Sequence, residues 1–164
     1  MTKKHILSIL VDNEPGVLSR IAGLFSGRGY NIESLCVAET AEPFVSRLTM
    51  VTKGDSAILE QIKKQLNKLI NVIKVSDLTD QEFVERELVM LKVNAKTENR
   101  AEILRVTDIF RGQVVDVGLE HFTISITGDA EKITAILNLL KPFGIREIAR
   151  TGSIAMFREY QSKS

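Results

Sequence analysis

Residues 12–35 read DNEPGVLSRIAGLFSGRGYNIESL, and this stretch sets the fold of the first half of the chain. Behind an opening of acidic, amide, proline and glycine residues, apolar residues recur at helical spacing: Val17, Leu18, Ile21, Leu24 and Phe25. The two glycines around Arg28 are what a left-handed helix end or a tight turn requires. The pattern predicts a helix over residues 15–27.

Strand patterns lie on both sides of this helix. KHILSILV at 4–11 precedes it, and apolar runs at 31–38 and 44–52 follow it. Gly54 and Asp55 then stop the last strand and cap a second helix. That helix is predicted at 56–70 and a closing strand at 71–78, so the element order is β-α-β-β-α-β.

The second half repeats this order. Strands are predicted at 87–95, 112–118, 121–127 and 144–150, and helices at 98–111 and 129–141. At a constant offset, Arg20, Ile21, Leu24, Phe25 and Gly27 reappear as Arg105, Val106, Ile109, Phe110 and Gly112. We therefore expect an α+β protein made of two ferredoxin-like βαββαβ domains, at 1–78 and 84–164, joined by a polar linker at 79–83. Each sheet would leave one face open to a partner or a ligand, and halves this small are expected to pair.

Composition limits the classes of function. The chain has 164 residues, 44% hydrophobic and 26% charged, and basic residues exceed acidic ones by one, so no global charge favours nucleic acid or a membrane surface. No apolar run approaches the roughly 20 residues of a membrane-spanning helix, and no signal peptide is evident, so we expect a cytoplasmic protein. Aromatic residues make up 5%, and the predicted central strands lack the stacking platform that RNA-recognition modules need.

The sequence shows no catalytic or metal-binding signature. Cys36 is the single cysteine and lies in an apolar strand pattern without a nearby base, which favours a buried apolar role. His5 and His121 lie far apart in sequence and belong to no metal-ligand spacing. The segment GRG at 27–29 follows a helix and lacks the rest of a dinucleotide fingerprint. We expect no catalytic residues, no metal and no cofactor on this chain.

The segment DNEPGVL leaves two interpretations open. As a binding loop, it presents the free N–H groups of a helix start to a carboxylate, with Pro15 in the first helical turn, Gly16 leaving the backbone accessible and Asn13 offering an amide. As a purely structural feature, Asp12 or Asn13 is an ordinary helix cap and Gly16 has no special role. The residues alone favour neither.

The segments DNEPGVLSRIAGLFSGRGYNIESL, SRLTMVTKGD, VEREL and DIFRGQVVDV closely resemble the small subunits of acetolactate synthase, also called acetohydroxyacid synthase. The likeness covers nearly the whole chain, and the N-terminal half resembles an ACT domain, a ferredoxin-like module that binds amino acids. The ending SIAMFREYQSKS departs from the family pattern.

The resemblance implies a regulatory subunit that performs no chemistry itself. It implies binding to the catalytic subunit, a transferase that carries thiamine diphosphate, Mg2+ and FAD and acts in branched-chain amino-acid biosynthesis. It also implies activation of that subunit, feedback inhibition by valine or by leucine or isoleucine, and a homodimer formed through the ACT domains. The alternative is a free-standing ACT-type amino-acid sensor that regulates another partner.

The resemblance places the effector between two chains. The loop of one chain would supply Asn13, Pro15, Gly16, Val17 and Leu18. The strand start of the other would supply Asn31 and Ile32.

Overall fold

The computed structural model describes residues 2–159 and divides them into two compact units. The first contains residues 2–84 and 153–159, and the second contains residues 85–152. The boundary after residue 84 lies next to the predicted linker at 79–83. The predicted second domain, 84–164, differs from the second unit because its described end, 153–159, belongs to the first unit.

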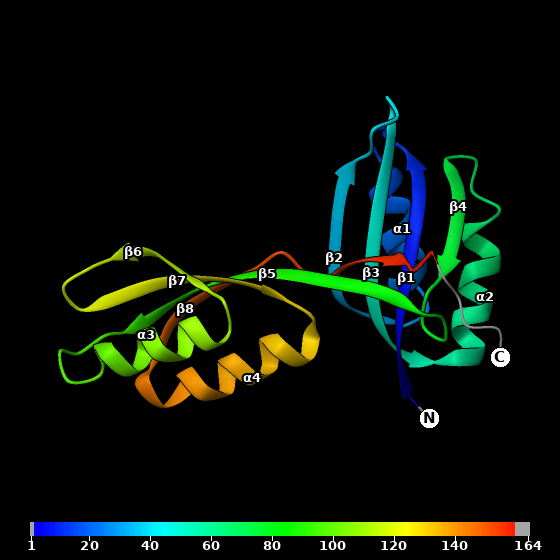
Figure 1. Ribbon diagram of the computed structural model, residues 1–164. Helices are drawn as coiled ribbons and strands as arrows, with labels where there is room; N and C mark the ends of the chain where they lie inside the picture. Colours follow the sequence, from blue (N-terminus) through cyan, green and yellow to red (C-terminus); the bar gives the residue numbers. More distant parts are fainter. Residues whose placement is uncertain (1, 160–164) are drawn as a thin grey trace. The chain divides into compact units, whose positions relative to one another are not determined.

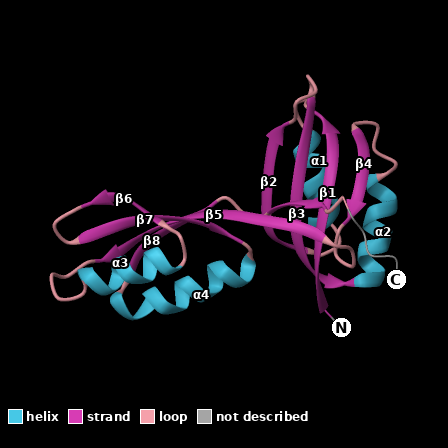
Figure 2. Cartoon of the chain, in the orientation of Figure 1, coloured by secondary structure: helices cyan, strands magenta, loops and turns pink. Residues whose placement is uncertain are grey.

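The first unit confirms the predicted β-α-β-β-α-β order (Figures 1 and 2). Its elements are β1 (Thr2–Asp12), α1 (Val17–Ser26), β2 (Asn31–Glu39), β3 (Val45–Asp55), α2 (Ser56–Leu66) and β4 (Val72–Asp77). The strands form an antiparallel sheet in the order β2-β3-β1-β4, with β2 and β4 at its edges. This is the ferredoxin-like arrangement.

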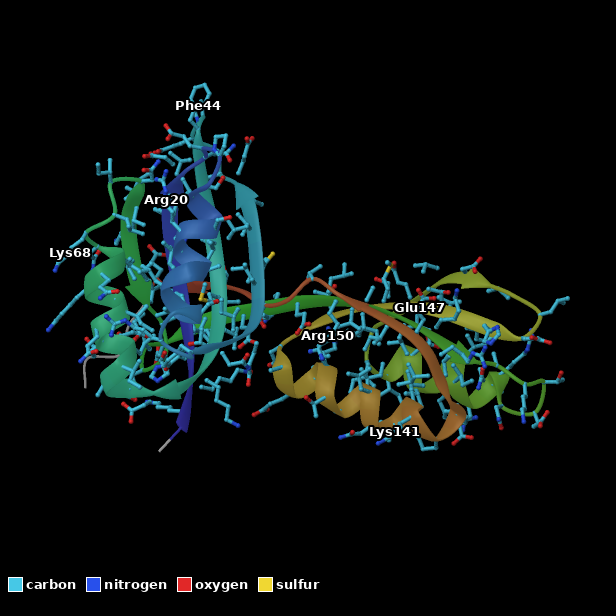
Figure 3. The ribbon with its side chains drawn as sticks, turned by 180° about the vertical axis from the view of Figure 1, so that it is seen from behind. Arg20, Phe44, Lys68, Lys141, Glu147 and Arg150 are labelled. Atoms are coloured by element: carbon cyan, nitrogen blue, oxygen red, sulfur yellow. The ribbon has the colours of Figure 1, made fainter. Side chains whose placement is uncertain are left out.

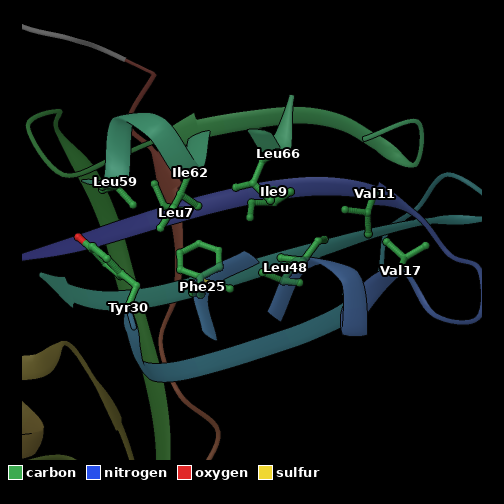
Figure 4. Close-up of a cluster of buried hydrophobic side chains, with 12 residues drawn as sticks. Leu7, Ile9, Val11, Val17, Phe25, Tyr30, Leu48, Leu59, Ile62 and Leu66 are labelled. Atoms are coloured by element: carbon green, nitrogen blue, oxygen red, sulfur yellow. The ribbon is translucent and has the colours of Figure 1, made fainter. Parts of the chain in front are cut away.

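The core of the first unit lies between the sheet and the two helices (Figure 4). Leu7, Ile9 and Val11 alternate along β1, as expected for a strand with one buried face. On α1, buried Val17, Ile21 and Phe25 are four residues apart and form one helical stripe. Complete burial of each such side chain contributes about 1.5–3 kcal/mol to stability. The core therefore fixes the direction of α1 and with it the place where that helix begins.

The opposite face of this sheet is partly covered by a strand that the sequence pattern does not predict. Strand β9 (Ile154–Phe157) places Ala155 in an apolar cluster with Ile6, Val51 and Leu78. Beside this cluster, Arg47 donates a 2.7 Å hydrogen bond to Ser8. The face expected to be open is thus closed in part by the chain's own C-terminal segment.

The second unit has the same order and topology as the first. Its elements are β5 (Phe83–Asn94), which begins in the first unit, α3 (Arg100–Ile109), β6 (Gln113–Val117), β7 (His121–Gly128), α4 (Ala130–Leu140), a 3-10 turn (Lys141–Phe143) and β8 (Ile145–Arg150). The strand order is β6-β7-β5-β8, and its core packs β5 and β7 against both helices. The predicted fold class, two ferredoxin-like domains, is confirmed.

An ion-pair network links α2 to the end of β4. Lys63 Nζ lies 2.6 Å from Glu60 Oε1 and 3.2 Å from Asp77 Oδ2, and Asp77 Oδ1 accepts hydrogen bonds from the Thr79 hydroxyl and backbone N–H. Burial by itself would raise the pKa of Asp77. The bonds from Thr79 and Lys63 outweigh burial and hold that pKa below its ordinary value.

Acid should remove the stabilisation that Asp77 provides. Because its pKa is lower in the folded state, Asp77 stabilises the fold above pH ~4, and this contribution disappears as pH falls through the folded-state pKa. We expect Asp77→Asn to lower the free energy of unfolding by about 1 kcal/mol at pH 7, with allowance for solvent screening. Urea unfolding of the wild type and of Asp77→Asn at pH 7 and pH 3 measures the difference in their free energies of unfolding. An equal difference at the two pH values would contradict this prediction.

Candidate functional site

The loop between β1 and α1 is held from two sides by consecutive backbone N–H groups. The N–H of Asp12 donates to the carbonyl of Asn71 at 2.8 Å, in the connection between α2 and β4. The N–H of Asn13 donates to the carbonyl of Phe44 at 2.7 Å, at the tip of the β2–β3 hairpin. The loop is therefore fixed relative to two separate surface segments.

Helix α1 begins without a side-chain cap, which contradicts the capping interpretation. Its N-cap is Gly16, at φ 86° and ψ −10°, and neither Asp12 nor Asn13 bonds to the helix. Pro15 precedes the cap, so the prediction that it occupies the first helical turn is wrong. By contrast, Asp55 and Asp129 cap α2 and α4 through their carboxylates.

Gly16 is required by its backbone conformation. A positive φ near 86° disfavours any residue with a Cβ, and the left-handed turn directs the chain from the loop into the helix. A Cβ added there would meet no atom within 4 Å, so the space beside the helix start is open.

The start of α1 leaves two backbone donors free. Val17 N–H makes a long 3.4 Å contact with the Glu14 carbonyl, and within residues 2–159 the N–H groups of Leu18 and Ser19 have no partner. Free N–H groups at the positive end of a helix dipole suit a carboxylate.

Polar acceptors lie at the edge of the same loop. The Asn13 side chain donates through Nδ2 to Glu39 Oε1 at 2.6 Å, which leaves the Asn13 amide oxygen without a bonded partner among the described residues. The Glu14 carboxylate accepts a 2.8 Å bond from Asn71. Sequence patterns did not identify Glu39 or Asn71, because each lies far from the loop along the chain and carries no motif of its own.

The predicted apolar residues differ in exposure. Val17 is 4% exposed and packs in the core. Leu18 is 43% exposed and presents its side chain to solvent. Of the two, Leu18 has the more accessible apolar side chain for a ligand.

Asn31 and Ile32 lie at the opposite end of β2 from the loop. Asn31 begins the strand and pairs with Lys53, whereas Glu39, which bonds Asn13, ends it and pairs with Ser46. Eight strand steps separate the two ends by about 26 Å. The structure thus brings Asn13, Pro15, Gly16, Val17 and Leu18 together within one chain, but not Asn31 and Ile32.

A cavity of about 280 Å³ opens beside the start of α1, on the side of β4. Arg20 Nη1 points to Asn71 Oδ1 across a distance of 3.4 Å. The residues that line the cavity are Val17, Arg20, Lys68, Leu69, Ile70, Asn71 and Val72. The sequence pattern gave no indication of this cavity.

The described part of the chain holds no cluster of three or more His, Cys, Asp or Glu side chains that could bind a metal ion. Within the same residues, none of the helices has the length and apolarity needed to cross a membrane.

Comparisons with known proteins identify both halves. Residues 7–74 match the family model described as the AHAS small subunit-like ACT domain, and residues 86–159 match the model described as the small subunit of acetolactate synthase. The acetolactate synthase small subunit of Aquifex aeolicus is 54% identical over 98% of this chain and 84% of its own length. The probable acetolactate synthase small subunit of Methanothermobacter thermautotrophicus is 55% identical over 94% of this chain and 92% of its own length.

A solved structure agrees. The crystal structure of the acetolactate synthase small subunit from Thermotoga maritima superposes with a TM-score of 0.86 at 43% identity, covering 96% of this chain and 99% of that one. The chain belongs to the family of acetolactate synthase small subunits and carries its ACT domain at residues 7–74.

Proposed function

We propose that this chain regulates the catalytic large subunit of acetolactate synthase. It activates that subunit and inhibits it when valine, or another branched-chain amino acid, binds at the β1–α1 loop. The observation that carries the proposal is the uncapped start of α1, where the N–H groups of Leu18 and Ser19 are free beside the open space at Gly16.

The loop offers complementary groups to both ends of an amino acid. The free N–H groups and the helix dipole suit the carboxylate. The Asn13 amide oxygen and the Glu39 carboxylate, which accepts the 2.6 Å bond from Asn13 Nδ2, suit the ammonium group. The exposed Leu18 side chain suits an aliphatic side chain.

A second chain would complete the site. Strand β2 is an edge strand whose one partner within residues 2–159 is β3, so its other edge can pair with a second copy. If two β2 strands pair antiparallel about a two-fold axis near Leu35, Asn31 of each chain lies opposite Glu39 of the other. Asn31 and Ile32 then reach the loop that they do not reach within their own chain.

Regulation follows from thermodynamic linkage between effector binding and the arrangement of the paired ACT domains. An effector that binds one arrangement of the paired ACT domains more tightly shifts the population toward that arrangement, and the bound catalytic subunits respond to it. The chemistry belongs to the catalytic subunit, on which we expect thiamine diphosphate, Mg2+ and FAD, and no cofactor is proposed for this chain.

Gly16→Asp tests this function. A carboxylate at position 16 repels the carboxylate of the effector and occupies the open space, so valine inhibition should be lost while activation of the catalytic subunit remains. Calorimetry with valine, leucine and isoleucine and an acetolactate assay with the catalytic subunit measure both effects. Gly23→Asp is the matched control, since Gly23 lies in the same helix and a Cβ there also meets open space.

Two outcomes would contradict the proposal. Full valine sensitivity of Gly16→Asp would show that the effector binds elsewhere. Valine binding without a stable complex with the catalytic subunit would instead support a free-standing amino-acid sensor.

A further inference from the structure

Two positively charged side chains flank one strand on the face of the first sheet that carries β9. Leu10 of β1 pairs with Arg47 of β3 on one side and with Lys74 of β4 on the other. Because Ile9 and Val11 face the helices, Leu10 and its two cross-strand partners face away from them. Neighbouring strands lie about 4.8 Å apart, so the two cationic residues begin about 10 Å from each other across Leu10.

Two hydroxyl groups lie in the next row of the same face. Ser8 pairs with Ser76, and Ser8 lies two residues before Leu10, which is about 7 Å along the strand. The Ser8 side chain is buried and accepts the 2.7 Å bond from Arg47 Nη1, so its own proton remains without an acceptor among the described residues. The other N–H groups of the Arg47 guanidinium also have no partner within residues 2–159. Free donors from two rows of the sheet thus face the same area.

These four polar side chains line one cavity of about 130 Å³. In Figure 1, β9 crosses β3 and β1 on the face of the sheet away from α1 and α2. Figure 3, seen from behind, shows the helix side instead, with Arg20 on α1 and Lys68 after α2, so the cavity that these two line is a different one. The apolar part of the 130 Å³ cavity consists of Leu10, Leu78, Ala155, Met156 and Phe157.

The positive charge in this cavity is not neutralised by the protein. Within residues 2–159, neither Arg47 nor Lys74 forms an ion pair with a carboxylate. Asp12, two residues beyond Leu10 on β1, forms no ion pair with either of them. Two like charges at one cavity repel each other, and an anion between them removes that repulsion.

We propose that this cavity binds a phosphate group. The guanidinium of Arg47 matches two phosphate oxygens with its fork of N–H groups, and Lys74 supplies a second positive charge. The hydroxyls of Ser8 and Ser76 donate to the remaining oxygens. A water molecule occupies about 30 Å³ in the liquid, so a cavity of about 130 Å³ has room for an anion of about five heavy atoms.

The donor set favours phosphate over a carboxylate or an amino acid. A carboxylate has one negative charge and two oxygens, too few for two cations and two hydroxyl donors. An amino acid also brings an ammonium group, and no acidic side chain lines the cavity to bind it. The proposal goes beyond the regulatory function proposed above and does not depend on it, because the cavity contains no residue of the β1–α1 loop.

The test is titration calorimetry of the full chain with inorganic phosphate, at an ionic strength held constant with sodium chloride. Lys74→Gln removes one charge from an exposed side chain that forms no ion pair within residues 2–159, so the fold should remain intact. We expect its dissociation constant for phosphate to rise at least tenfold. Phosphate should also raise the unfolding temperature of the wild type, and Lys74→Gln should lose this rise.

The matched control is Lys53→Gln. Lys53 lies on β3, on the same face as Arg47, and it is exposed, but it does not line the cavity. This variant should bind phosphate as the wild type does. Gly16→Asp should also bind phosphate normally, so that failure of either proposal leaves the other intact.

A second probe, methyl phosphate, distinguishes the source of the phosphate group. Equal affinity for methyl phosphate and inorganic phosphate would support a phosphorylated metabolite as the ligand, whereas much weaker binding of methyl phosphate would support the free ion. Three results would overturn the proposal: no binding of either probe by the wild type at millimolar concentration, equal phosphate binding by Lys74→Gln and the wild type, or equally tight binding of acetate.

Discussion

Mixing two inactive variants should restore valine binding. Gly16→Asp disables the loop and Asn31→His disables the strand start, so each variant alone should bind valine at least tenfold more weakly. After the two chains exchange at equal concentrations, half of the dimers are mixed. Each mixed dimer has one site with both defects and one site with none, so about a quarter of the wild-type capacity should return.

The result depends on the geometry of β2. Within one chain Asn31 lies about 26 Å along the strand from Glu39, whose carboxylate bonds the loop residue Asn13, so a site that contains both Asn31 and the loop must use two chains. Calorimetric stoichiometry, with Gly23→Asp and Asn31→His as the control mixture, measures the recovery. Failure to recover any capacity, when chain exchange is verified by mass spectrometry, would place the whole site within one chain.

Removal of Arg150 should destabilise the second unit. The Glu87 side chain is 5% exposed, and Arg150 binds it with both arms of the guanidinium, at 2.6 Å from Nε to Oε1 and 3.0 Å from Nη2 to Oε2. The bonds to Glu87 raise the pKa of Arg150 despite its partial burial. Arg150→Ala leaves a buried carboxylate unpaired, and because the Arg150 side chain is 47% exposed and partly screened by solvent, we expect a loss of about 2 kcal/mol in the free energy of unfolding.

Urea unfolding of the full chain measures this loss. Arg146→Ala is the matched control, because Arg146 lies on the same strand and forms no ion pair within residues 2–159. The variant with both Glu87→Leu and Arg150→Met should lose less than Arg150→Ala, since the cost comes from the unpaired charge. A double variant as unstable as Arg150→Ala would contradict that explanation.

Elements with a clear period could be predicted from the sequence. The stripe of Val17, Ile21 and Phe25 located α1, and Asp55 located the start of α2, because a cap and a helical period are local signals. The predicted ends of the helices and strands were less accurate. Helix α1 begins at Val17 instead of residue 15, since Gly16 adopts a left-handed conformation that the sequence does not reveal.

The parts that could not be predicted depend on contacts between distant residues. Strand β9 has four residues and gains its place from Ile6, Val51 and Leu78, which lie more than seventy residues earlier in the chain. In the candidate site, the loop itself was identified from DNEPGVL, but its bonds to Glu39, Phe44 and Asn71 were not. No local pattern encodes a partner of that kind.

The return of β9 has a consequence for synthesis on the ribosome. The first unit is interrupted by the second, so its last strand emerges only after residues 85–152 have been made. Until then Ile6, Val51 and Leu78 lack the cover of Ala155. The nascent first unit therefore exposes an apolar sheet face for several seconds at ordinary elongation rates, during which a chaperone or a second nascent chain can occupy it.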